Sequence, residues 1–350
     1  MSRDRDVSMA AIKAAVRRRL ADVYYRTGQF KRRLRGKVLI LTYHRVLSET
    51  ELAQDYVQRG MYVRADVFAA QMRFVKEHFE VLPLARLLDL WSVGELDEGS
   101  RYCVITFDDG WRDNYVHAYP ILRRLGIHAT IFLPTRFVGT NDWFWPEKLA
   151  HIMWQRSRSR PDRENDRGHP VASIEAKIGQ WKQMGRADID RALQQTLRQW
   201  GGSLPRTRIV MNWDEVAEMG RAGIAFGSHS ATHTILTHEC AEDVDRELRD
   251  SLHELRERQV NCVPVFCYPN GDYSAKIVDQ VKAAGYRGAV CSDPGWETRV
   301  PRDLFTLRRV AIHNDVSQTV SMFAFRLSGL DEILRRPWLA LRARADEATA

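Results

Sequence analysis

Two short motifs hold residues that could bind a metal ion. Asp108 and Asp109 stand between an apolar run and a glycine, and His229 and His233 stand four residues apart further along the chain. Taken alone, adjacent carboxylates before a glycine most often form a polar turn. A helical turn beginning at Ser230, a good N-cap residue, would make both histidines face the same way. Together, two imidazoles and a carboxylate form a three-ligand set with open positions, which a hydrolytic metal site requires.

The segments that precede these motifs are predicted to be strands. Each is a short apolar run rich in β-branched and aromatic side chains, and the runs are continuous rather than alternating, which is typical of a sheet buried on both faces. The seven predicted strands are Lys37–Tyr43, Tyr102–Phe107, His128–Leu133, Ile224–Ser228, Val263–Tyr268, Arg287–Ser292 and Thr306–Ile312.

Helical patterns separate several of these strands. Apolar residues recur at helical spacing in Asp66–Phe79, Trp213–Arg221, Ala241–Gln259 and Ser274–Ala284. Strands that alternate with helices indicate βαβ units and a parallel sheet. We therefore predict an α/β fold in which seven such units close as an irregular (β/α)7 barrel.

The predicted strand ends carry residues capable of chemistry. In a parallel barrel the carboxyl ends of the strands converge on one face, where active sites form. The residues expected there are His44, Asp108, Asp109, His229, Tyr268, Pro269, Asn270, Asp293 and His313. The sequence therefore predicts one site built from several strand ends.

The motifs resemble those of the polysaccharide deacetylase family, which comprises the NodB homology domain and is similar to carbohydrate esterase family 4. Thr-Phe-Asp-Asp-Gly at residues 106–110 and His-Ser-Ala-Thr-His at residues 229–233 match the family's first two motifs. The segments Leu41–Val46 and Trp213–Val216 are also similar, and Phe266–Gly271 resembles the Tyr-Pro-x-Gly form of the third motif.

This resemblance implies a metal-dependent hydrolase that removes an N-acetyl group from an amino-sugar glycan or glycan precursor, in an irregular barrel of the NodB-homology type. Asp109, His229 and His233 would hold a divalent transition metal, most often zinc in such sites. Asp108 would be the general base that takes a proton from the attacking water. The metal would activate that water and stabilise the tetrahedral oxyanion.

The resemblance also implies a general acid and a substrate-binding surface. A histidine would protonate the leaving amine; His313 is the best match for it, and His44 is the reserve candidate. Tyr268, Pro269, Asn270 and His44 are expected to contact the substrate.

The third motif departs from the family's pattern at one position. Cys267 stands where many members carry an arginine that pairs with the base aspartate. Another group must therefore orient Asp108, or the pKa of this base is set in a different way.

Alternative functions use the same residues. The site could hydrolyse an O-acetyl ester or a small-molecule amide instead of an N-acetylated glycan. A non-catalytic carbohydrate-binding relative is the alternative from another class of protein. The presence of Asp108, Asp109, His229 and His233 together argues against that alternative, because a binding protein has no use for all four.

The chain divides into three predicted regions. Residues 1–36 form a basic arm, residues 37–315 the deacetylase barrel, and residues 316–350 a helical tail. Residues 139–208 interrupt the alternation of strands and helices and are predicted to be an insertion with two helices and a solvated loop at Ser157–Pro170.

The arm accounts for the charge of the protein. The chain has 53 Lys and Arg and 45 Asp and Glu, a net charge of +8, and residues 1–36 alone hold 11 basic and 3 acidic residues, so the remainder is neutral. The arm's apolar residues share one helical face, namely Ile12, Val16, Leu20, Val23 and Tyr24. Such a face either docks on the barrel or lies on an anionic membrane.

The remaining composition limits partners and location. The neutral body offers no extended footprint for nucleic acid, so we expect an acetylated glycan or a lipid-linked sugar as substrate. No apolar run approaches the ~20 residues of a membrane span, and the first residues do not resemble a secretory signal. The expected location is the cytoplasm, with a peripheral position at the inner membrane face if the arm binds lipid. The five cysteines form no Cys-x-x-Cys pair, so neither a disulfide framework nor a cysteine zinc site is expected.

Overall fold

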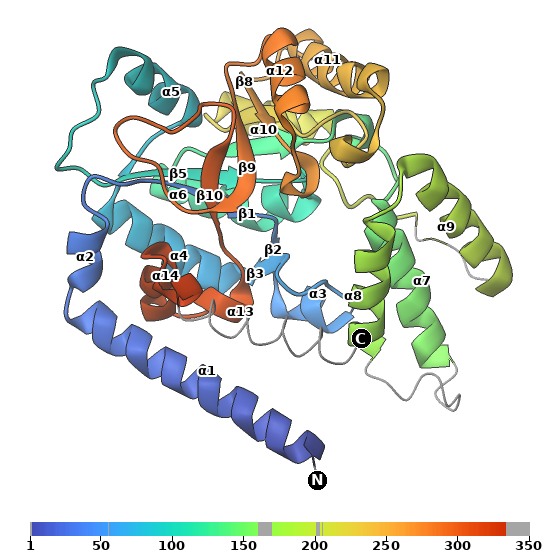
Figure 1. Cartoon of the computed structure of the whole chain (residues 1–350), viewed down its shortest axis with the longest axis horizontal. Coiled ribbons are helices and arrows are strands. Elements are labelled where there is room, and N and C mark those ends of the chain that lie inside the picture. The colour runs from blue at the N-terminus through green and yellow to red at the C-terminus, as the bar shows by residue number, and fades with distance from the viewer. Residues whose placement is uncertain (1, 55, 160–169, 201–203, 205, 334–350) are drawn as a thin grey trace.

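The computed structural model describes residues 2–54, 56–159, 170–200, 204 and 206–333, with side chains described from residue 14 onward except at residue 170. Its centre is a closed barrel of seven parallel strands (Figure 1). The strands pair in chain order, and the last returns to pair with the first. They are β1 (Val38–Tyr43), β5 (Tyr102–Phe107), β6 (Thr130–Leu133), β7 (Ala225–Ser228), β8 (Cys262–Cys267), β9 (Gly288–Pro294) and β10 (Leu307–Ala311). The predicted strands and barrel are thus confirmed.

The burial of these strands explains their continuous apolar sequences. Every residue of β1 and β5 is buried, because one face of each strand fills the barrel interior and the other lies under helices. These two strands pair over six residues, from Val38 opposite Tyr102 to Tyr43 opposite Phe107. This register brings the residues that follow both strands, His44 and Asp108, to the same end of the barrel.

Helices cover the ring of strands, and all four predicted helices are confirmed to within two residues at each end (Figure 1). They are α4 (Ala65–His78), α10 (Trp213–Arg221), α11 (Ala241–Glu257) and α12 (Ala275–Ala283). Helix α10 begins at a reciprocal capping box between Asn212 and Glu215. Further short elements are α2 (Gln29–Arg33), β2 (Arg45–Leu47), α3 (Glu49–Gln54), β3 (Tyr62–Arg64), β4 (Glu80–Val81), α5 (Leu84–Val93), a π-helical turn (Asn114–Ala118), α6 (Tyr119–Leu125) and α13 (Asn314–Ser317).

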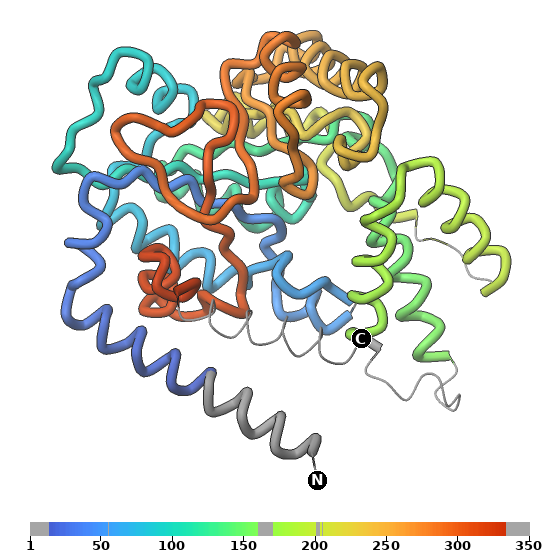
Figure 2. The backbone as a smooth tube through the Cα atoms, viewed as in Figure 1, coloured from blue at the N-terminus to red at the C-terminus, as the bar shows by residue number. Residues whose placement is uncertain are grey.

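The insertion forms a helical unit beside the barrel. It contains three helices in its described part, one more than the sequence predicted: α7 (Trp145–Ser159), α8 (Pro170–Trp181) and α9 (Arg186–Trp200). They share a small apolar core of their own, which includes Leu149, Ile178 and Leu193. In Figure 2 they lie together on one side of the molecule. Most of the predicted solvated loop, residues 160–169, lies outside the described residues.

Most of the basic arm is one long helix, α1 (Ser2–Arg26), which packs on α14 (Val320–Leu327) from the C-terminal region (Figure 2). Ala21 is buried against Met322 and Phe325, and the Tyr24 hydroxyl donates to Ser328 Oγ at 2.8 Å. Three other residues of the predicted apolar face do not dock: Val16, Leu20 and Val23 are 52%, 47% and 62% exposed. The side chain of Ile12 and the predicted tail residues 334–350 lie outside the described part.

None of the described helices is long and apolar enough to cross a membrane.

Candidate metal and catalytic site

The two aspartates follow β5 in a tight turn that fixes their directions. Asp109 has a left-handed φ of 71°, which a residue with a Cβ adopts only when its surroundings enforce it. The next residue, Gly110, also has a positive φ, and a Cβ there would lie 2.6 Å from Leu133 Cδ2. Trp111 Nε1 donates to Asp109 Oδ2 at 2.9 Å. The other carboxylate oxygen of Asp109, Oδ1, therefore faces the histidines.

The histidines follow β7 in a loop, and no helical turn begins at Ser230. Ser230 Oγ does accept from the His233 backbone N–H, as an N-cap would, but no helix follows. Instead the Glu247 carboxylate of α11 accepts from the backbone N–H groups of Ala231 and Thr232, both at 2.8 Å. Ser230 and His233 have positive φ values of 63° and 56°. The loop is thus held in a strained shape that points both imidazoles toward Asp109.

Asp109, His229 and His233 have the geometry of a metal-ligand set. His229 Nε2 and His233 Nε2 lie 3.3 Å and 3.0 Å from Asp109 Oδ1. Ligand atoms about 2.0–2.1 Å from a tetrahedral metal are separated by roughly 3.3 Å, so these spacings fit such an ion. His229 Nδ1 lies 2.7 Å from the Cys267 carbonyl oxygen, which can only accept, so Nδ1 carries the proton and Nε2 is free to bind metal.

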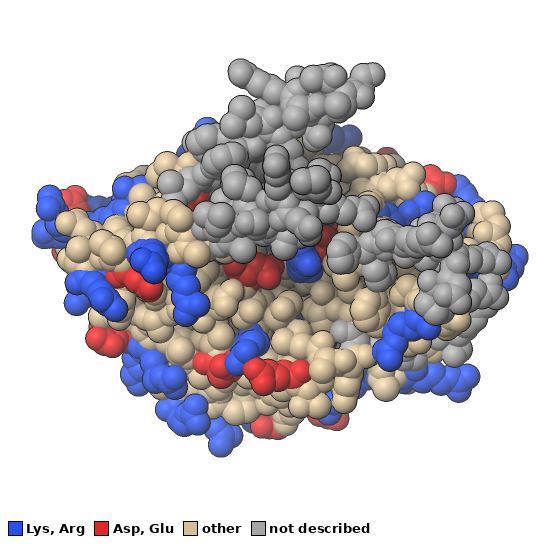
Figure 3. All heavy atoms as spheres, turned by 90° about the horizontal axis from the view of Figure 1, so that it is seen from below, with Lys and Arg blue, Asp and Glu red and all other residues tan. Residues whose placement is uncertain are grey.

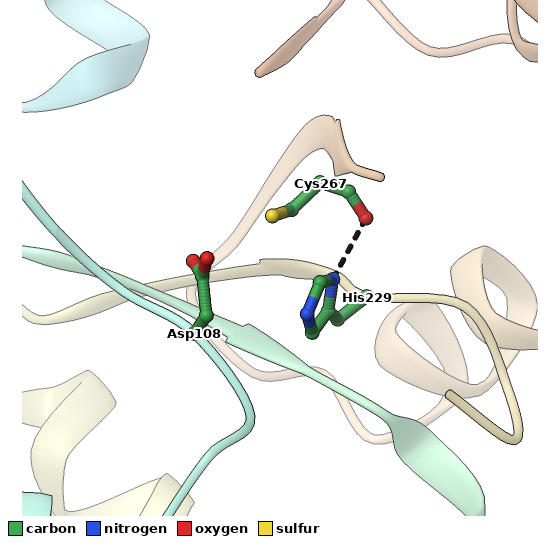
Figure 4. A group of neighbouring side chains, drawn as sticks. All are labelled: Asp108, His229 and Cys267. Atoms are coloured by element: carbon green, nitrogen blue, oxygen red, sulfur yellow. Dashed lines mark hydrogen bonds between the residues drawn. The ribbon is translucent and has the colours of Figure 1, made fainter. Parts of the chain in front are cut away.

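A second group, Asp108, His229 and Cys267, is also close enough to suggest a metal site, but the Arg309 guanidinium lies against two of its three members (Figure 4). In Figure 4 the dashed line marks the bond from His229 to the Cys267 carbonyl. The Cys267 thiol lies 3.3 Å from Arg309 Nη2, and both carboxylate oxygens of Asp108 accept from the same guanidinium. Of these two groups among the described residues, the set around Asp109 therefore fits a cation better.

Arg309 on β10 supplies the partner that Asp108 needs. Its Nη1 and Nη2 atoms each donate to one Asp108 oxygen at 2.7 Å, and the side chain is buried inside the barrel. Burial alone would raise the pKa of Asp108, but the Arg309 guanidinium, together with His229 and His44, holds this pKa below its ordinary value. The arginine missing at Cys267 is thus replaced in space by one from another strand, which the sequence analysis did not identify.

The remaining predicted site residues divide between the cavity and its surroundings. A cavity of about 160 Å³, here called the site cavity, is lined by the metal-ligand set and by Asp108, His44, Tyr268 and Asn270. Pro269 is buried and does not line it. His313 does not line it either; its Nδ1 lies 3.4 Å from Asp315 Oδ2. His44 Nε2, by contrast, lies 3.9 Å from Asp108 Oδ2.

The insertion contributes a wall that the sequence analysis did not foresee. Trp145, Glu147 and Lys182 line the site cavity, and Lys182 Nζ donates to Asn270 Oδ1 at 2.7 Å. Burial, and next the charge of Asp109, raise the pKa of Glu147 to about 7. No local pattern marks these residues, because only the packing of the insertion against the barrel brings them to the site.

Comparisons with known proteins agree with this fold and assign the chain to a family. The family model described as "Polysaccharide deacetylase" matches residues 96–289, more than half of the chain. A Bacillus subtilis (strain 168) protein, YxkH, which is provisionally named a polysaccharide deacetylase, is 20% identical over 282 residues, covering 81% of this chain and 74% of that protein.

Solved structures share the fold at low identity. The Streptococcus pyogenes deacetylase PplD, in complex with acetate, has a TM-score of 0.54 and 20% identity, with 81% of this chain and 95% of that one covered. A de-N-acetylase from Aggregatibacter actinomycetemcomitans has a TM-score of 0.56 and 14% identity, with 83% and 100% covered.

Proposed function

Because this chain belongs to the polysaccharide deacetylase family, we propose that it is a metal-dependent hydrolase that removes the N-acetyl group from an amino-sugar glycan or glycan precursor. The observation that carries this proposal is the convergence of Asp109, His229 and His233 beside the Asp108–Arg309 pair in one cavity. A hydrolytic site needs a Lewis acid and a base within reach of one acetyl group, and this arrangement supports both.

Asp109, His229 and His233 would hold the ion, and their mixture of imidazole and carboxylate favours zinc over magnesium or calcium. When bound, the metal supplies a Lewis acid that activates water and polarises the acetyl carbonyl. The Trp111 and Cys267 hydrogen bonds to this set would fix the direction of each ligand.

Asp108 would take the proton from the attacking water. A carboxylate has about four lone-pair positions, and Arg309 and Thr42 use three of them, two on Oδ2 and one on Oδ1. A lone pair on Oδ1 is left for water. Because Arg309 keeps the pKa of Asp108 low, the base would be ionised and ready throughout the neutral range.

We propose His44 as the general acid in place of His313, because His44 lines the site cavity beside Asp108. Burial lowers the pKa of His44 below its ordinary value, against the pull of Asp109 and Asp108. His44 would therefore start neutral, gain the proton that Asp108 removes from water, and pass it to the leaving amine. The role of His313 stays a sequence-based prediction.

The His44→Ala variant is expected to lose ~10²–10⁴-fold in amide hydrolysis but much less in hydrolysis of an activated acetyl ester, whose leaving group needs no proton. The measurement is kcat/KM for both substrates, with His313→Ala as the matched comparison. If His313→Ala lowers the amide-to-ester ratio and His44→Ala does not, the acid is His313 and our assignment is wrong.

The activity itself is tested by acetate release from metal-loaded protein. The substrates should include N-acetylglucosamine oligomers, nucleotide-linked sugars and lipid-linked sugar precursors, with O-acetylated sugars and small acetamides as alternatives. Release from O-acetyl esters or small amides alone would replace the proposed substrate. Saccharide binding with no release from any substrate would favour the non-catalytic alternative.

The arm supports a second element of the proposal, contact with an anionic membrane surface that presents a lipid-linked substrate. Val16, Leu20 and Val23 are exposed on α1, and Arg18, Arg19 and Arg26 are exposed on the same helix. Figure 3 views the molecule from the side of α1, and Lys and Arg groups lie there together with Asp and Glu groups. Because charges of both signs lie on this face, attraction to an anionic lipid surface would depend on the arm. Each basic residue of the arm near that surface would contribute ~1 kcal/mol of binding free energy.

Flotation with anionic liposomes tests this contact. The full-length protein is expected to float with the liposomes at low salt and to float less at high salt. A Val16→Ser, Leu20→Ser, Val23→Ser variant is expected not to float with them. Val93→Ser is the control, because Val93 on α5 is 63% exposed and lies outside the arm. Wild-type protein that fails to float at low salt would exclude a membrane role for the arm.

A further inference from the structure

A cavity outside the proposed active site is lined by three arginines. It measures about 330 Å³, is here called the arginine cavity, and shares no lining residue with the site cavity. Its wall comes from α2, from β10 and the segment before it, and from the end of α14 with the residues that follow. The arginines are Arg33, Arg308 and Arg326. The proposed deacetylase chemistry uses none of them.

A backbone carbonyl holds each of these three side chains in place. The hydrogen bonds are Arg33 Nε to Ser328 at 2.7 Å, Arg308 Nη2 to Trp296 at 2.7 Å, and Arg326 Nε to Ala311 at 3.0 Å. Each guanidinium keeps at least one terminal nitrogen that donates to none of the residues that the structure describes. The three groups are therefore positioned in advance and still have donors for a ligand.

Carboxylates lie beside two of the arginines without occupying the cavity. Arg308 Nε is 2.9 Å from Glu297, and Arg326 Nη1 is 3.5 Å from Asp331 and 2.8 Å from Glu332. Glu297 and Asp331 are 2% and 1% exposed and do not line the cavity, whereas Glu332 does. The two buried carboxylates thus fix the guanidinium groups from outside the cavity.

Further basic side chains give this region an excess of positive charge. Arg33 forms no ion pair with the residues that the structure describes, and its guanidinium lies 5.9 Å from the centre of the Trp296 ring. Lys37 Nζ lies 5.7 Å from the same ring, and Arg17 pairs with Asp331 at 3.3 Å. Among the described residues, five basic side chains are therefore grouped with three carboxylates.

This arrangement suits a phosphate group. Arginine binds phosphate oxygens through charge-assisted hydrogen bonds, and its planar fork of donors matches their spacing. A phosphate presents several oxygens in different directions, so guanidinium groups from separate elements can donate to it at once. The small excess of positive charge matches the single negative charge of a phosphate diester.

The apolar part of the wall and the neighbouring arm indicate that the phosphate belongs to a lipid. Leu327 and Ile333 line the cavity beside the arginines, and Ile333 is 51% exposed. Ser328, whose carbonyl accepts from Arg33, also accepts from the Tyr24 hydroxyl of α1. The cavity therefore adjoins the helix whose exposed apolar residues are proposed to contact a membrane.

We propose that the arginine cavity binds the phosphate of an anionic phospholipid headgroup. Arg33, Arg308 and Arg326 donate to the phosphate oxygens, and the apolar rim at Ile333 contacts the first part of the acyl chains. Basic pockets next to a membrane-contacting helix are suited to such headgroups. This inference rests on the part of the proposed function that places the arm on a membrane, and it does not depend on the deacetylation reaction.

Binding is measured by calorimetry on the full-length protein with short-chain lipids that stay monomeric in water. The ligands are dihexanoyl phosphatidylglycerol, dihexanoyl phosphatidylcholine, glycerol phosphate and inorganic phosphate. Phosphatidylglycerol is expected to bind most tightly, because phosphatidylcholine carries a cation that offsets its phosphate and the other two ligands have no acyl chains.

The Arg33→Gln variant is expected to bind phosphatidylglycerol about 10-fold or more weakly, since a hydrogen bond to a charged group is lost. Arg33 is exposed and has no carboxylate partner among the described residues, so this variant should fold normally. Arg308→Gln should weaken binding in the same way, with thermal unfolding as the check on its fold. Arg299→Gln is the matched control, because Arg299 pairs with Glu98 and does not line the cavity.

Absence of phosphatidylglycerol binding, or unchanged affinity in both Arg33→Gln and Arg308→Gln, would overturn the inference. Equal affinities for inorganic phosphate and phosphatidylglycerol would overturn the lipid assignment, because the site would then be one for free phosphate.

The arm variant Val16→Ser, Leu20→Ser, Val23→Ser separates this site from the arm. It is expected to bind soluble phosphatidylglycerol as the wild type does, even though it does not float with liposomes. Loss of soluble binding in this variant would place the lipid on the arm and overturn the cavity as its site. Phosphatidylglycerol binding without acetate release from any substrate would remove the deacetylase function and keep the lipid site, and acetate release without lipid binding would do the reverse.

Discussion

Replacing Asp108 by asparagine is expected to lower kcat by ~10²–10⁴-fold while the protein keeps its metal. The amide has nearly the size of the carboxylate but cannot accept a proton from water. Asp108 is not a ligand in the set that fits a cation, since Arg309 engages both of its oxygens. The measurements are kcat and the metal content of the same preparation.

The matched control is Asp109→Asn, which should weaken metal binding itself because Asp109 Oδ1 faces both imidazoles. The His229→Ala, His233→Ala double variant should lose the metal altogether. Elemental analysis should find about one transition metal ion per chain in the wild type. An Asp108→Asn protein with near-normal kcat would show that another residue is the base, and stoichiometric metal in the double histidine variant would exclude the proposed ligand set.

The barrel could be predicted because its local pattern and its tertiary environment agree. Strands buried on both faces must be apolar throughout, so β1 and β5 stand out from the amphipathic helices between them. The barrel topology then brings strand ends together, so the amino-acid sequence alone was enough to place the residues after β5 and β7 in one site. The two motifs occur at those two ends.

Arg309 could not be assigned in the same way, because its contact with Asp108 joins residues 201 positions apart. The sequence does contain a signal, since two adjacent arginines lie inside a predicted buried strand. Side chains alternate along a strand, so one of them must point inward. Arg308 pairs with Glu297, and Arg309 turns into the barrel.

The insertion and the arm show the other limit of sequence patterns. Helical spacing predicts that a face is apolar but not what covers it. The α1 face was assigned as one unit, although Tyr24 docks while Val16, Leu20 and Val23 are exposed. Likewise, nothing local to Glu147 or Lys182 indicates that α7 and α8 reach the site cavity. Such contacts depend on the packing of separate units, which periodicity does not encode.

Replacing Arg309 by methionine is expected to destabilise the protein by about 3–5 kcal/mol, the usual result of leaving a buried charge without its partner. In the wild type the depressed pKa of Asp108 stabilises the fold above the unfolded-state pKa, and this stabilisation is lost as the pH falls through the folded-state pKa. Without Arg309, burial raises the pKa of Asp108. The folded state is then destabilised most at pH values where the buried carboxylate must be ionised. The stability deficit should therefore be largest at neutral pH and shrink as the pH falls, as measured by urea denaturation.

The same substitution should move the acidic limb of the kcat/KM profile to higher pH, because the base must then be ionised against burial alone. Arg309→Lys is the control: it keeps the positive charge but cannot bind both carboxylate oxygens in the bidentate geometry of arginine. The acidic limb of the lysine variant should shift less than that of the methionine variant. Both variants should retain metal, since Arg309 contacts none of the three proposed ligands through its described hydrogen bonds. An acidic limb that stays in place in Arg309→Met would mean that Arg309 serves only the fold and that Asp108 is not the group whose ionisation limits turnover.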